Sequence, residues 1–190
     1  TEKGWAMGSF RDFRDRFNQT LDRYLTPAVK WILLANVAVF LVVGFFFLPF
    51  GREVEFLQFF AQNPIVKIDP EPGGGLSIDF NWLCTMQFFT YMFVHVDVMH
   101  LLFNMLALWF FGPPLEYRWG TAAFVKFYVF TGFLAGLLHG ILAPFLPGAV
   151  MNYYMFGASG AIFGVLLAFA IYYPEQRILL WFLVPIPARV

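Results

Sequence analysis

The chain has 190 residues, of which 60% are hydrophobic, 22% aromatic and only 13% charged. Soluble domains carry about 25% charged residues, so the composition excludes an ordinary soluble globular protein and predicts an integral membrane protein. The formal net charge is zero and no basic stripe is present, which excludes a nucleic-acid partner. Cys84 is the only cysteine, so no internal disulfide can form, and no Cys/His cluster predicts a metal site.

The first thirty residues are mostly polar and predict a cytoplasmic amphipathic segment. Between residues 10 and 25 apolar side chains recur at helical spacing with arginines between them. This pattern is typical of a helix that lies in the membrane interface, although a solvated helix docked on its own protein shows the same periodicity. No signal-peptide cleavage site follows. We therefore expect an N-terminal segment at 1–30 and a transmembrane domain at 31–190.

Four apolar segments are predicted to span the membrane. Each has about the 20 residues that cross a hydrocarbon core of ~30 Å, and each is bounded by proline, glycine or charge. They cover residues 31–50, 89–111, 121–143 and 155–173. Between the first two, several prolines and a triple glycine predict an irregular loop, whose aromatic residues favour a position partly in the membrane interface. The predicted fold class is an all-α polytopic helical bundle.

The positions of the basic residues predict the orientation of this bundle. Nine of the twelve lysines and arginines lie before the first span, between the second and third, or after the fourth, whereas Arg52 and Lys67 lie in the first loop. By the positive-inside rule the N-terminus is cytoplasmic. A last apolar piece at 178–184 is too short to cross the membrane. Because the sequence also lacks an initial methionine, we expect both ends to be cut from a longer protein.

Polar residues inside a predicted span are costly and mark a functional site by default. The second span contains His95, Asp97, His100 and Asn104. On a helical wheel His100 and Asn104 share a face, whereas His95 lies about 140° from His100. His100 and Asn104 are therefore expected to direct their donors toward one point.

The fourth span opens with the sequence Gly157-Ala158-Ser159-Gly160. A serine between small residues near a helix N-terminus can expose its hydroxyl, and the backbone N–H and the helix dipole there favour an oxyanion. The alternative is a packing face, because Gly160 and Gly164 lie four residues apart. A rise of ~1.5 Å per residue places Ser159 about 21 Å above the cytoplasmic end of its span, against about 16 Å for His100. The two side chains thus reach similar depths.

Three motifs together resemble the rhomboid intramembrane serine proteases: the stretch from His95 to Asn104, the Glu116-Tyr117-Arg118 that follows it, and the glycine-flanked serine. The resemblance covers about residues 86–190 and implies a bundle of six helices, four of them visible here. It implies Ser159 as the nucleophile. It also implies an oxyanion hole made by His100, Asn104 and the Ser159 backbone N–H.

The same resemblance implies supporting roles for other residues. His95, Gly157 and Gly160 would shape the cavity, and Glu116 would pair with Arg118 at the cytoplasmic end. The general base would be a histidine on a sixth helix, outside this chain, that packs against the glycines of the fourth span. Many members carry Trp-Arg just before the second span, where this chain has Met86 and Gln87.

The activity implied by the resemblance is cleavage of transmembrane segments of membrane proteins, within the bilayer and without a cofactor or metal. Substrates would carry helix-breaking residues near the outer face, because cleavage requires an extended backbone. The expected location is a bacterial inner membrane. The oligomeric state stays open, since glycine faces serve internal packing as readily as dimerisation.

These residues also admit other interpretations. A rhomboid-like protein without protease activity, which binds membrane proteins or thins the bilayer, is the main alternative. A haem-binding bundle using His100 and His139 leaves the serine motif unexplained, and its two ligands differ in depth by about 11 Å. His139 as the base lies about 6 Å shallower than Ser159. A metalloprotease is disfavoured because His95 and His100 are five apart with no glutamate between them.

Overall fold

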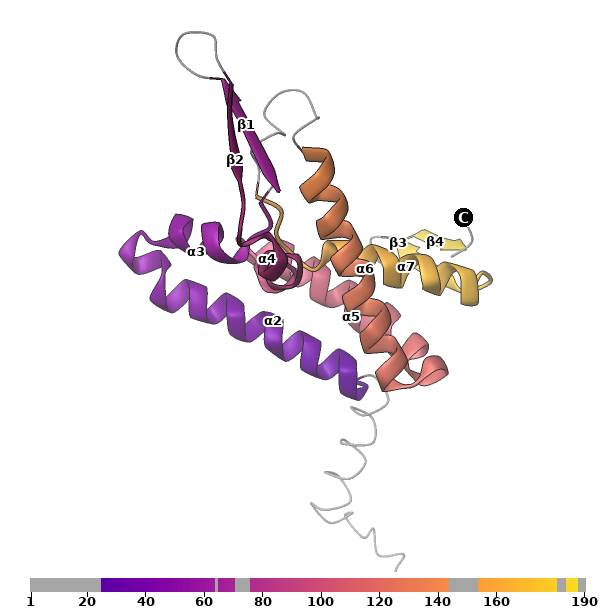
Figure 1. The fold of residues 1–190 in the computed structure, drawn as a ribbon. Coiled ribbons are helices and arrows are strands. Elements are labelled where there is room, and N and C mark those ends of the chain that lie inside the picture. Colours follow the sequence, from indigo (N-terminus) through magenta and orange to yellow (C-terminus); the bar gives the residue numbers. More distant parts are fainter. Residues whose placement is uncertain (1–24, 64, 71–75, 144–153, 181–183, 188–190) are drawn as a thin grey trace, which may run out of the picture.

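The computed structural model describes residues 25–63, 65–70, 76–143, 154–180 and 184–187. The predicted interfacial helix at 10–25 lies almost entirely outside them. The described part is mostly helical (Figure 1). Its helices are α2 (Pro27–Phe46), α3 (Glu53–Phe60), α4 (Cys84–Thr90), α5 (Val98–Trp119), α6 (Thr121–Leu142) and α7 (Ser159–Tyr172), with single 3-10 turns η1 (Leu48–Phe50) and η2 (Tyr91–Phe93).

Three of the predicted spans form helices long and apolar enough to cross a membrane. They are Pro27–Phe50, which joins α2 to η1, then Val98–Trp119 and Thr121–Leu142. The fourth, α7, is apolar but has only 14 residues. This is shorter than the ~20 residues that a perpendicular span requires. Three of the four predicted spans are thus helices that could cross a membrane, and the count of four remains a prediction.

The second span begins later than predicted. The sequence predicts it at 89–111, but the helical structure is interrupted after η2, and α5 starts at Val98 and continues to Trp119. The cause is Asp97, whose extended backbone and side chain cap the helix by accepting the His100 N–H at 2.7 Å. His95 therefore lies outside the helix, and the predicted angle of 140° between His95 and His100 is wrong.

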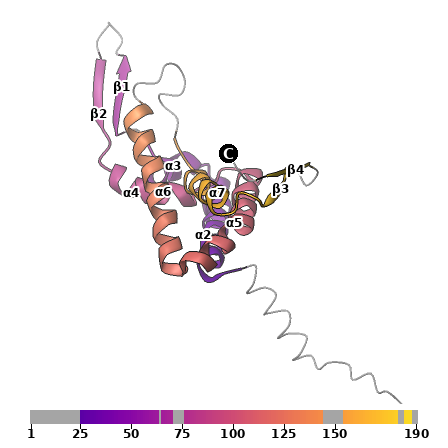
Figure 2. The same ribbon diagram turned by 90° about the vertical axis from the view of Figure 1, so that its right-hand side faces the viewer.

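The central helix of the described part is α7, which packs between α5 and α6, while α2 lies against α5 (Figures 1 and 2). The core holds large side chains without solvent exposure, among them Leu108, Leu115, Phe124 and Val165. Many other large apolar side chains point outward, such as Phe45 and Phe163. Lipid tails are as apolar as these side chains, so close packing rather than hydrophobic burial holds such helices together.

Small residues allow α7 to approach α6 closely. A β-carbon on Gly160 would lie 2.6 Å from Cβ of Ala135, and one on Gly164 would lie 2.7 Å from Cγ2 of Thr131. In the described part these two glycines face α6, and the packing of a sixth helix against the glycines of this span remains a prediction. The matching prediction that Gly160 and Gly164 permit close helix approach is confirmed.

Glu116 joins three helices at one end of the bundle. Its buried carboxylate accepts hydrogen bonds from Thr26 Oγ1 (2.5 Å), the Ala28 N–H (2.9 Å), the Val29 N–H (3.1 Å) and Thr121 Oγ1 (2.7 Å). These donors belong to the starts of α2 and α6, where free N–H groups and the helix dipole favour a negative charge.

The predicted pairing of Glu116 with Arg118 is wrong. The Arg118 guanidinium lies 4.7 Å from the centre of the Tyr172 ring, a cation–π contact with α7. Side chains two residues apart on a helix do not face each other, so Glu116 and Arg118 reach different neighbours.

Two short antiparallel hairpins correct the all-α prediction. Strands β1 (Val66–Pro70) and β2 (Leu76–Phe80) pair with Ile68 opposite Ile78 and project beyond α6 (Figure 1). They flank the glycine-rich stretch that was predicted to be irregular. Strands β3 (Arg177–Leu180) and β4 (Val184–Pro187) form the second hairpin, in the apolar piece that was predicted to be too short to cross the membrane.

Candidate active site

The predicted polar residues of the second span gather around the first turn of α5. The His95 side chain is buried, and its Nε2 lies 3.2 Å from Nδ2 of Asn104. The His95 and His100 rings meet edge to face, with their centres 5.0 Å apart. Asn104 Nδ2 also donates to the His100 carbonyl at 2.9 Å. The two histidines and the asparagine thus form one contiguous polar cluster.

Gly157 connects this cluster to the start of α7. Its φ of +100° is a left-handed conformation that other residues adopt only with strain. Its N–H donates to the Tyr91 carbonyl at 2.9 Å. A β-carbon at this position would lie 2.6 Å from Nε2 of His100, so the imidazole packs directly on the glycine. Both the conformation and the close contact require glycine here.

Ser159 is the first residue of α7 and is partly exposed. The preceding residue, Ala158, is the N-cap, and its N–H points to Nε2 of His95 at 3.5 Å, at the long end for a hydrogen bond. Within the described residues the Ser159 hydroxyl makes no hydrogen bond. The structure therefore brings His95, His100 and Asn104 to the segment that carries Ser159, without a direct bond from the serine hydroxyl to them.

The chemistry that the site around Ser159 can support follows from its hydrogen-bond donors and from its position at the start of α7. Free N–H groups at the start of a helix and the positive end of its dipole favour negative charge beside Ser159. The Asn104 amide carries two N–H donors, and both are engaged, one with His95 Nε2 and one with the His100 carbonyl. His95 Nε2 can accept this bond in the neutral tautomer whose proton lies on Nδ1.

The first loop is attached directly to the segment before Ser159. Gln62 and Met155 form an isolated antiparallel bridge, with each N–H donating to the other's carbonyl at 2.8 Å. Ile65 N–H donates to the carbonyl of Gly140 at the end of α6. Sequence reasoning did not find this attachment, because backbone pairing between residues 93 apart leaves no local signal.

Gln87 holds the first loop together and was also missed as a structural residue. Its side-chain oxygen accepts from Asn81 Nδ2 (2.8 Å) and the Asn63 N–H (3.3 Å), and its Nε2 donates to the carbonyl of Gln58 (2.7 Å). Gln87 is fully buried. The residue that departs from the rhomboid Trp-Arg pattern thus occupies the centre of the loop's hydrogen-bond network.

His139 lies in the last turn of α6, and its Nδ1 is buried without a partner among the described residues. It forms no hydrogen bond with Ser159 in that part of the chain. Likewise, no group of three or more His, Cys, Asp or Glu side chains within the described ranges could hold a metal ion.

Comparison with known proteins identifies the family. A family model described as Rhomboid domain matches residues 84–190, more than half of the chain. The chain therefore belongs to the rhomboid family, and with its long apolar helices it is an integral membrane protein.

Individual relatives match different lengths of this chain. Rhomboid protein 1, mitochondrial, of Saccharomyces cerevisiae is 40% identical over 95 residues, which are 50% of this chain and 27% of the yeast protein. Rhomboid protease GlpG of Salmonella paratyphi A is 36% identical over 135 residues, 71% of this chain and 42% of that protein. RHOMBOID-like protein 12, mitochondrial, of Arabidopsis thaliana is 27% identical over 203 aligned positions that cover 100% of this chain and 55% of the plant protein.

The chain thus spans roughly a quarter to a little over half of these relatives. Because the relatives include both mitochondrial and bacterial proteins, they do not distinguish the predicted bacterial inner membrane from a mitochondrial location.

Proposed function

We propose that this chain carries the nucleophile and the oxyanion-binding groups of an intramembrane serine protease. The observation that carries the proposal is the packing of His100 on Gly157, two residues before Ser159. This contact sets an imidazole beside the segment that leads into α7, whose first residue is the partly exposed Ser159. A packing face alone would not require a buried His95, a partly exposed His100 and an asparagine at the same place.

In the proposed first step, Ser159 Oγ attacks the carbonyl carbon of the scissile peptide bond. A histidine outside residues 1–190 accepts the hydroxyl proton and later donates it to the leaving amine. The carbonyl oxygen becomes an oxyanion, and the acyl-enzyme then forms as the C–N bond breaks. Water attacks the ester in the second half of the reaction and restores the serine.

The oxyanion would be stabilised by the Ser159 backbone N–H, the His100 ring and the Asn104 amide. To donate to the oxyanion, the Asn104 amide would have to break one of the two hydrogen bonds that it makes in this structure. The bond that breaks is the longer one, to His95 Nε2 at 3.2 Å. The 2.9 Å bond to the His100 carbonyl is kept and holds the amide in place. His95 then acts as a positioning residue for both neighbours, and Gly157 and Gly160 allow the close approach of His100 and α6.

The proposed substrates are membrane proteins with a transmembrane segment that unwinds near the Ser159 end of the bundle. The proposed topology has the N-terminus in the cytoplasm and α7 as the fourth span. Glu116 and Arg118 then lie at the cytoplasmic end, and Ser159 opens below the outer surface. At that depth a polar cluster persists when it lines a water-filled cavity.

A fluorophosphonate probe on the full-length protein tests this proposal. We expect labelling of the wild type and of His139→Ala, and no labelling of Ser159→Ala or of protein pretreated with unlabelled probe. Labelling that persists in Ser159→Ala would exclude Ser159 as the nucleophile. If the folded wild type is not labelled under conditions that label a known rhomboid protease, the protein is an inactive family member.

A further inference from the structure

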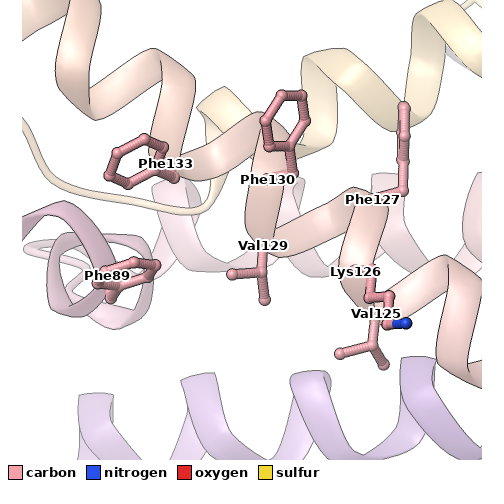
Figure 3. Close-up of a pocket in the computed structure, with 7 residues that line it drawn as sticks. All are labelled: Phe89, Val125, Lys126, Phe127, Val129, Phe130 and Phe133. Atoms are coloured by element: carbon pink, nitrogen blue, oxygen red, sulfur yellow. The ribbon is translucent and has the colours of Figure 1, made fainter.

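An open apolar groove of about 720 Å³ runs along the face of α6 (Figure 3). Phe89 of α4 and Phe133 of α6 stack at one end, with ring centres 5.5 Å apart, and Val125 and Lys126 lie at the other end. Val129 and Phe130 lie between them. This surface is separate from the Ser159 cluster.

The groove contains a single charge, at the end near the start of α6. Lys126 is exposed, and no ion pair or hydrogen bond of its ammonium group forms within the part of the chain that the structure describes. Around it the wall is almost entirely aliphatic and aromatic. A single cation at the end of an apolar groove complements a ligand with an anionic headgroup and a hydrocarbon tail.

From Lys126 to Phe133 the groove is about 10.5 Å long, so it fits within one leaflet, whose hydrocarbon is ~15 Å thick. Lys126 lies five residues from the start of α6 and Phe133 twelve residues from it, which are about 7.5 Å and 18 Å along the helix. The hydrocarbon core is ~30 Å thick, so the stacked phenylalanines lie near its middle. A spanning helix from another protein would need a surface across the full thickness, whereas an acyl chain needs only half.

We propose that this groove binds one anionic phospholipid, whose phosphate pairs with Lys126 and whose acyl chain lies against Val129 and Phe130 as far as Phe133. The lysine stem follows the apolar wall while its ammonium group reaches the headgroup. The proposal does not depend on whether Ser159 is a nucleophile.

Native mass spectrometry of the reconstituted protein tests the proposal. The full-length protein is extracted from vesicles made of equal parts dioleoylphosphatidylcholine and dioleoylphosphatidylglycerol, and the retained lipid is identified. We expect one phosphatidylglycerol per chain. Lys126→Gln should lower its retention about five-fold, as removal of one lysine near an anionic surface does. Lys30→Gln is the matched control, because Lys30 is exposed on α2 and lies outside the groove wall, and it should retain the lipid.

A second variant tests the binding of the acyl chain without changing the charge of Lys126. Val129→Trp keeps Lys126 but fills the middle of the groove, and it should lose the lipid while keeping the wild-type circular dichroism spectrum. Equal losses in Lys126→Gln and Lys30→Gln would reduce the effect to general surface charge and overturn the proposal. Retention of the lipid by Val129→Trp would also overturn it. So would disulfide-linked dimers formed by Phe130→Cys in a Cys84→Ala background, since a second copy would then cover the groove.

Discussion

Gly157 and His100 are in contact across the two helices that carry the candidate site, with no space for a β-carbon between them. Gly157→Ala would place a methyl group 2.5 Å from Cε1 of His100 and would impose a side chain on a backbone with φ of +100°. We expect the free energy of unfolding to fall by about 1–3 kcal/mol, and fluorophosphonate labelling of Ser159 to be lost in the molecules that remain folded.

The matched control for that variant is Gly44→Ala. Gly44 lies within α2 and has nothing within 4 Å of a β-carbon, so alanine there should be neutral or stabilising by up to about 1 kcal/mol. Equal labelling of the two variants would show that His100 does not need its present position.

Asn104→Ala removes the amide that joins His100 and His95. If this amide also stabilises the oxyanion, cleavage of a transmembrane substrate should slow by about 100- to 1,000-fold in kcat, with a much smaller change in KM. Asn36→Ala is the control, because Asn36 is another buried asparagine that donates to the carbonyl four residues earlier, Ile32 O at 2.8 Å. A kcat that falls equally in both variants would indicate a structural effect only.

Glu116→Ala leaves two hydroxyls and two backbone N–H groups without their acceptor at the junction of three helices. We expect a loss of about 2–4 kcal/mol in the free energy of unfolding, measured in detergent, because unpaired buried donors cost about 1–3 kcal/mol each and part of that cost is relieved by water. Glu55→Ala, which breaks an exposed pair with Arg52 at 2.7 Å, should cost less than about 1 kcal/mol. Similar costs for the two would mean that the Glu116 bonds are weak in solution.

Gln87→Ala should loosen the first loop. The variant removes the acceptor of the Asn63 N–H and the donor to the Gln58 carbonyl, so amide hydrogen exchange in residues 58–63 should accelerate by about ten-fold or more, the equivalent of ~1.4 kcal/mol or more of local stability. Exchange in α7 provides the internal reference. Unchanged exchange at Asn63 would contradict a central role for the glutamine in that loop.

The long helices were predictable because span length and hydropathy are local properties of the sequence. The start of α5 was readable too, since Asp97 precedes Val98 as a helix cap and its carboxylate accepts the N–H of the third residue. Treating the whole apolar stretch as one span placed His95 in the helix. A helix that starts at Val98, with Asp97 as its cap, leaves His95 outside α5, where its side chain can contact Asn104.

Other features had weaker signals or none. The alternation in Val66–Pro70 and Leu76–Phe80 around a glycine-rich stretch is a hairpin pattern that the prolines obscured. The bridge of Met155 to Gln62 and the contacts of Gln87 with Gln58 and Asn63 connect residues 24 or more positions apart, so they leave no local signal in the sequence. The same applies to Glu116, whose motif is visible but three of whose four donors lie about ninety positions away.

The bonds of the Glu116 carboxylate also bear on how the helices assemble in the membrane. Its donors come from residues that precede it by nearly ninety positions and from Thr121, which follows it by only five. A nascent chain that has released α5 but not α6 holds this carboxylate without one of its hydroxyl partners. The bonds are complete only when α2, α5 and α6 have met, so Glu116 stabilises the finished three-helix junction over every partly inserted intermediate.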